Sequence, residues 1–110
     1  MAFDEGLAER VRGVLRDRSD VVEKKMFGGL CFMVAGHMTV GISGDELMVR
    51  VGKDRYDDAM AQPHAREMDF TGRSLKGFVY VGTDGFASDD DLTGWVGRGL
   101  ANTDSLPPKS

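Results

Sequence analysis

The chain of 110 residues has one cysteine and two histidines. A single thiol, Cys31, cannot form an internal disulfide and excludes a cysteine-only metal site within one chain, so we expect a reducing compartment. The sequence also lacks any apolar run near the ~18 residues that a membrane-spanning helix needs. Asp4 and Glu5 stand where a secretory signal peptide would carry basic residues. These absences predict a cytoplasmic protein without a membrane partner.

The sequence also lacks an excess of positive charge, with 14 lysines and arginines against 18 acidic residues. The formal net charge is −4, so the composition does not support a broad electrostatic surface for nucleic acid, although a local basic patch leaves a nucleic-acid partner open. The hydrophobic fraction of 41% and charged fraction of 29% are ordinary for a soluble globular protein, and the length fits one domain.

Apolar periodicity predicts three helices. From Phe3 to Arg18 apolar residues recur every three or four positions, which is the period of an amphipathic helix. A short helix fits residues 53–61, ending before Pro63. Ser88 is a good N-cap for a third helix, which begins with acidic residues at the positive end of its dipole. The buried stripe of that helix consists of Leu92, Trp95, Val96 and Leu100.

Glycine is frequent in this third helix, at Gly94, Gly97 and Gly99. Each costs about 1 kcal/mol relative to alanine in a helix interior, so the helix must depend on tertiary packing.

Between the helices the period changes to two, which predicts strands. Three triplets of alternating apolar residues indicate an antiparallel meander, and strand-like runs follow at 68–70 and 78–81. The triplets are Leu30, Phe32 and Val34, then Met38, Val40 and Ile42, then Leu47, Val49 and Val51. We therefore predict an α+β fold, with a five-stranded antiparallel sheet, an N-terminal helix, a short middle helix and a C-terminal helix. One domain would span residues 1–102, and residues 103–110 would form a flexible tail.

The first hairpin turn is Ala35-Gly36. Because a type I′ turn requires positive φ at both positions and alanine is poor at one of them, we expect a type II turn or a slightly longer loop.

The double glycine Gly28-Gly29 at the start of the meander marks a bulge or a place where another backbone or a ligand comes close. The less apolar face of the meander has Met33, Met48 and Arg50, which helices would cover or which would belong to a recognition surface. We predict a candidate interaction surface made of Lys24, Lys25, Met26, Phe27, Gly28, Gly29, Met33, Met48 and Arg50.

Two functions fit this surface. In the first, the chain is a regulatory or protein-interaction module that uses the strand edge, with a protein partner or a second copy. In the second, Lys24, Lys25 and Arg50, with Arg73 and Lys76, gather around the free amides of Gly28-Gly29 and bind a phosphate or a nucleic-acid backbone. Clustering of these cations would favour the second function, and dispersal would remove it.

No residue pattern predicts catalysis. His37 and His64 lack the spacing of a metal pair or a catalytic dyad, and both suit exposed turns. Cys31 lies inside a strand and should be a buried hydrophobe whose pKa is raised. No glycine loop opens a helix as a cofactor site requires. We predict no catalytic residue, no metal and no cofactor.

Several segments together resemble the TfoX/Sxy family, N-terminal domain, over residues 23–100. They are Lys25-Met26-Phe27-Gly28-Gly29, the turn at Gly36, the Leu47-to-Val51 strand, Met68 with its following aromatic, and Asp91-Leu92-Thr93-Gly94-Trp95. Residues 69–73 and 76–81 look like the short stand-alone bacterial members.

The resemblance implies a small α+β module linked to transcription regulation of competence, with no agreed enzymatic activity. The two-domain regulators carry a further helical domain, and the sequence stops before one, so the resemblance leaves the competence role open.

Overall fold

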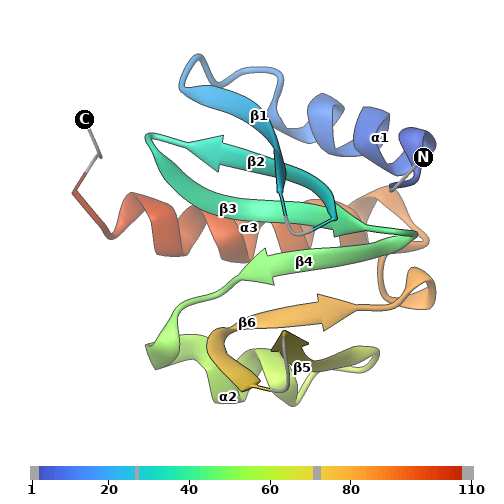
Figure 1. Cartoon of the computed structure of the whole chain (residues 1–110), viewed down its shortest axis with the longest axis vertical. Helices are drawn as coiled ribbons and strands as arrows, with labels where there is room; N and C mark the ends of the chain where they lie inside the picture. The colour runs from blue at the N-terminus through green and yellow to red at the C-terminus, as the bar shows by residue number, and fades with distance from the viewer. Residues whose placement is uncertain (1–2, 27, 71–72, 108–110) are drawn as a thin grey trace.

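The computed structural model describes residues 3–26, 28–70 and 73–107 and has an α+β fold (Figure 1). Three α-helices accompany one antiparallel sheet, as predicted. In chain order the elements are α1 (Glu5–Leu15), β1 (Val21–Met26), β2 (Gly29–Val34), β3 (His37–Ser43), β4 (Glu46–Arg50), α2 (Tyr56–Met60), β5 (Ala65–Phe70), β6 (Arg73–Val81) and α3 (Asp89–Asp104). Two 3₁₀ turns, η1 (Lys53–Arg55) and η2 (Thr83–Phe86), precede α2 and α3.

Within the described residues the sheet has six strands in the order β1-β2-β3-β4-β6-β5, so the prediction of five strands was wrong. The additional strand is β1. Its residues Val22, Glu23, Lys24 and Lys25 are all exposed, because β1 lies at the edge of the sheet and buries neither face fully. An edge strand of this kind carries charges instead of alternating apolar residues, so a period of two cannot reveal it.

The helices and one face of the sheet form the main core. Leu7 and Val11 of α1, Ala59 of α2 and Trp95 of α3 belong to the same buried cluster as Phe32. Helix α3 passes behind β3 and β4 in Figure 1 and packs directly on both strands. Burying each large apolar side chain of this cluster stabilises the fold by roughly 1.5–3 kcal/mol.

A β-bulge in β3 changes which side chains reach this core. Phe32 pairs with Val40 but Met33 pairs with Met38, so Thr39 is the extra residue. The bulge moves Met38 to the opposite face, where it packs with Cys31 and Met48. The expectation that Met38 shares a face with Val40 was therefore wrong.

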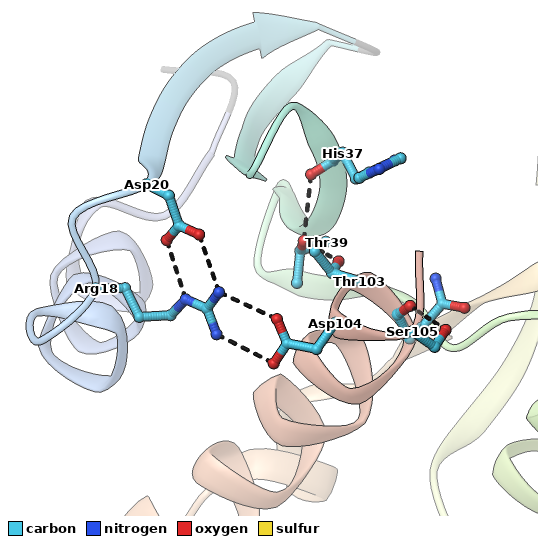
Figure 2. Close-up of polar contacts among 8 residues, drawn as sticks. Arg18, Asp20, His37, Thr39, Thr103, Asp104 and Ser105 are labelled. Atoms are coloured by element: carbon cyan, nitrogen blue, oxygen red, sulfur yellow. Dashed lines mark hydrogen bonds and ion pairs between the residues drawn. The ribbon is translucent and has the colours of Figure 1, made fainter. Parts of the chain in front are cut away.

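The same bulge directs Thr39 toward the end of α3 (Figure 2). The Thr39 hydroxyl donates to the His37 carbonyl at 3.2 Å and lies 2.6 Å from Thr103 Oγ1, and both threonines are buried. A hydrogen bond between buried groups is costly to break, since each hydroxyl would lose its partner without regaining water.

Helix α3 lies unusually close to β3 at Gly99. A Cβ at this position would lie 2.7 Å from the Thr39 carbonyl oxygen and 3.0 Å from its methyl group. By contrast, a Cβ at Gly97 meets nothing within 4 Å. Of these two glycines of α3, Gly99 is therefore the one that packing requires.

An ion pair holds the same end of α3 (Figure 2). Arg18, after α1, contacts Asp20 at 3.0 Å and Asp104 of α3 at 3.1 Å. Arg18 lowers the pKa of Asp20 by hydrogen bonding. The arginine thus connects the loop between α1 and β1 to the last turn of α3.

The turn Ala35-Gly36 differs from the expected type. Both residues have positive φ, 52° at Ala35 and 83° at Gly36, which is the pattern of a type I′ turn. The prediction of a type II turn was wrong because the right-handed twist of a two-residue hairpin favours type I′ strongly enough to place an alanine in the left-handed region.

We predict opposite effects for two alanine substitutions in α3. Gly97→Ala should raise the free energy of unfolding by about 1 kcal/mol through helix propensity. Gly99→Ala should lower it by about 1–2 kcal/mol, since the overlap with Thr39 outweighs the same propensity gain. Urea denaturation of both variants tests this, and equal stabilisation by both would show that α3 does not need its close approach to β3.

We also predict that Ala35→Asn raises the free energy of unfolding by about 0.5–1 kcal/mol, because asparagine tolerates positive φ better than alanine. Ala35→Val should lower it, since a branched Cβ increases the strain. Thermal or urea unfolding gives both values. A stabilising Ala35→Val would be incompatible with a type I′ turn.

Candidate functional site

The double glycine lies at the corner between β1 and β2. Gly28 is exposed, whereas Gly29 is buried as the first residue of β2. A Cβ on Gly29 would overlap the carbonyl oxygen of Ile42 in β3. The sequence predicted that another backbone or a ligand comes close to the double glycine. A backbone does come close to Gly29, and it is that of β3 in the same chain. Phe27 and the side chain of Met26 lie outside the described residues.

The predicted cations do not converge on this corner. Lys24 pairs with Cys31 and Lys25 with Leu30, so the two lysines point to opposite faces of the sheet. Arg50 lies at the far end of β4, three residues beyond Leu47, the partner of Ile42. That separation is about 10 Å along the strand. Dispersal of these three residues removes the support for an anion site at Gly28-Gly29, and the side chains of Arg73 and Lys76 lie outside the described part.

The two predicted methionines do come together. Met48 is fully buried and Met33 is half-buried, in a second cluster with Cys31 and Met38 on the face of the sheet that α3 does not contact. Phe78 and Tyr80 of β6 pack at its side. All the residues of this cluster belong to strands. Of the two predicted methionines, Met48 serves as core and Met33 retains an accessible surface.

Val22 extends this surface to the edge of the sheet. It pairs with Met33 and is 55% exposed, the most accessible large hydrophobic side chain of the described residues. The sequence interpretation missed Val22, because β1 shows no alternation of apolar and polar residues and a single valine does not reveal a strand. Within residues 3–26, 28–70 and 73–107, β1 pairs with β2 alone, so its outer backbone groups face solvent.

Helix α1 holds β1 in place from the side. Arg12 contacts Glu23 of β1 through Nε and Nη2, each at 2.8 Å, and Glu9 at 2.6 Å. The hydrogen bonds from Arg12 lower the pKa of Glu23, so this carboxylate stays ionised well into the acid range.

The histidines lie in different environments. His37 is buried, which contradicts the expected exposed turn. Its Nε2 donates to the Pro107 carbonyl at 2.6 Å, because the chain after α3 lies against the first residue of β3. His64 is exposed, as predicted, and has a φ of 69°. Its carbonyl accepts a bond from the Gly82 amide at 3.1 Å.

Cys31 has no exposed surface, and burial raises its pKa to about 11, both as predicted. No group of three or more potential ligands gathers in the described part of the chain to hold a metal ion. None of the helices there is long and apolar enough to cross a membrane.

Two hollows lie in the described part of the chain, and the smaller one includes Arg50 of the predicted surface. The larger, of about 750 Å³, lies beside α3 and is lined by residues that include His64, Asp84, Trp95 and Arg98. Arg98 in this hollow contacts Asp58 at 2.8 Å and stacks 5.2 Å from the Trp95 ring. The smaller, of about 450 Å³, lies at the turn after β4 and is lined by Arg50, Lys53 and Arg55, among others.

A family model, described as the TfoX N-terminal domain, matches residues 14–103. No curated protein and no solved structure matches the chain.

We predict that native Cys31 resists alkylation. At pH 8 a thiol with a pKa near 11 has a far smaller thiolate fraction than an ordinary cysteine, so iodoacetamide should react at least about 100-fold more slowly with the native protein than with the protein in denaturant. Mass spectrometry of timed samples measures both rates. Equal rates would place Cys31 at an accessible, activated position.

Proposed function

The chain belongs to the TfoX N-terminal domain family, and on this premise we propose that it is a non-enzymatic regulatory module that binds another protein through the exposed edge of β1. The family resemblance supports the regulatory role. The single observation that supports the contact site is the unpaired outer side of β1, with Val22 exposed beside Met33.

An edge strand can bind a partner through its main chain. Its free N–H and C=O groups pair with an incoming strand, while alternate side chains set the specificity. Val22 provides the apolar contact on one face, next to the half-buried Met33. The bond between Arg12 and Glu23 keeps β1 attached to α1, so the edge is already ordered before a partner arrives.

The lysines of β1 determine which strand can add. Lys24 and Lys25 are both exposed, and edge lysines oppose indiscriminate pairing. A suitable partner therefore needs an acidic residue opposite one of them.

A second copy of this chain provides such a residue. If two β1 strands pair antiparallel around a two-fold axis at Lys24, Glu23 of each copy faces Lys25 of the other, on the same face of the extended sheet. The two Lys24 side chains then face each other on the opposite face, which weakens the pair. We therefore take a homodimer as the first partner to test.

We predict opposite effects of the two lysines on self-association. In Lys25→Glu the new glutamate of each copy faces Glu23 of the other, so the two-fold axis creates two repulsive pairs. The dimer should weaken about tenfold. Lys24→Gln removes the repulsion at the axis and should strengthen it about two- to threefold. Sedimentation equilibrium over a concentration series measures both constants.

Lys53→Glu is the matched control, because it makes the same charge change at an exposed site beyond the end of β4 and should leave the dimer unchanged. Equal weakening by Lys25→Glu and Lys53→Glu would place the contact elsewhere. A protein that stays monomeric and captures no partner through β1 would refute the proposed function.

A further inference from the structure

The chain has a net charge of −4, yet one groove has an excess of positive charge. Arg50 ends β4, and Lys53 and Arg55 follow in η1, so three cations lie within six residues of one turn. They line the groove of about 450 Å³ with a single carboxylate, Asp54. We propose that this groove binds a small phosphorylated ligand with a planar ring, of the mononucleotide class.

The backbone fixes the position of the turn that carries these cations. The amides of Val51 and Gly52 both donate to the Gly77 carbonyl of β6, at 2.7 and 3.1 Å. Gly52 has a φ of 87°, and a Cβ there would overlap the side-chain amide of Asn102 in α3. The turn is therefore held from two sides, and a preorganised site loses less entropy when a ligand binds.

The cations of the groove are available to an anion. Arg10, Arg12, Arg18, Arg66 and Arg98 all contact carboxylates within 4.0 Å. In the described part of the chain, Arg50, Lys53 and Arg55 have no such contact. A phosphate can therefore accept charge-assisted bonds from them without displacing an internal partner.

An aromatic ring lies beside the cations. The Arg50 guanidinium stands 5.6 Å from the centroid of the Phe78 ring, and both residues line the groove. Planar bases stack well on phenylalanine rings and on arginine guanidinium groups. Because the guanidinium already lies over the Phe78 ring, the ring of the ligand would stack on the outer side of Arg50, next to the charges that hold its phosphate.

The far wall limits the length of the ligand. It is formed by Asn102, Ser105 and Leu106 at the end of α3, where the helix dipole is negative. The carbonyl of Asn102 accepts from the Ser105 amide at 3.1 Å and hydroxyl at 2.6 Å, so it is internally satisfied. Because this wall and the Asp54 carboxylate repel further negative charge, the groove favours a ligand with one or two phosphates over a long polyanion.

The volume of the groove also fits a ligand of the size of a mononucleotide. Sites for small molecules occupy roughly 300–1,000 Å³, a range that includes this groove. Arg50 was expected to serve an anion at Gly28-Gly29, whereas its structural neighbours are Lys53, Arg55 and Phe78.

The test is a titration of the ¹⁵N-labelled protein with AMP, followed by amide shifts. We expect saturable shifts confined to residues 50–55, 77–78 and 102–106. Arg50→Met and Lys53→Gln should each weaken AMP binding about tenfold. Because Lys53 is exposed, its substitution leaves the fold intact even if Arg50→Met does not. Arg16→Gln, which removes an exposed cation that belongs neither to β1 nor to the lining of the groove, is the control and should bind AMP as the wild type does.

Competing probes distinguish the ligand classes. We expect inorganic phosphate to bind more weakly than AMP, and a single-stranded thymidine oligonucleotide to bind no more tightly per site. Phosphate equal to AMP, or an oligonucleotide much tighter than AMP, would overturn the mononucleotide assignment. Absence of saturable shifts, or shifts unchanged in both Arg50→Met and Lys53→Gln, would overturn the site itself. The same titration can be made with Lys25→Glu, which weakens the proposed dimer but does not change the groove. Failure of the mononucleotide site can therefore be distinguished from failure of the β1 contact.

Discussion

The close contact between α3 and β3 is the constraint on which the rest of the structure depends. Gly99 brings the helix backbone against Thr39, and the bulge in β3 turns Thr39 toward Thr103 so that two buried hydroxyls satisfy each other. With the helix held at this distance, Trp95 and Val96 reach the main core. The same placement puts Asn102 against Gly52 and Asp104 against Arg18. One helix thus positions both the turn after β4 and the loop that leads into β1.

The two proposed binding surfaces follow from where this arrangement leaves the sheet uncovered. The main core uses one face, and the strands themselves close much of the other with Cys31, Met38 and Met48. The β1 edge, with Val22, and the turn after β4 are among the surfaces that remain accessible. Both are places where backbone groups or unpaired charges meet solvent, which is where binding concentrates in small domains.

The sequence predicted the elements whose large apolar residues recur with a regular period. The three helices and the strands of the meander belong to this class, and the position of Cys31 inside such a strand predicted its burial. The sequence could not predict β1, because a strand that buries neither face fully has no period, nor the bulge at Thr39, which depends on the partner strand. For the candidate site, Gly29 correctly indicated a close backbone, yet only the register shows that this backbone is Ile42 of β3. Arg50 was recognised as a candidate, but its neighbour Phe78 comes from a strand far along the chain.

The two surfaces share α3 while remaining separate in space. β1 is three strands from β4, or about 14 Å across the sheet, so a strand added at the edge would not block a ligand in the groove. Helix α3 contacts both sides: Asn102 borders the groove, and Asp104, two residues later, holds Arg18 ahead of β1. A ligand that moved the last turn of α3 would therefore act directly on the Arg18 ion pair. The segment from Asn102 to Asp104 therefore offers a short physical connection between the groove and the β1 edge, whereas the sheet between them consists of tightly packed, buried side chains.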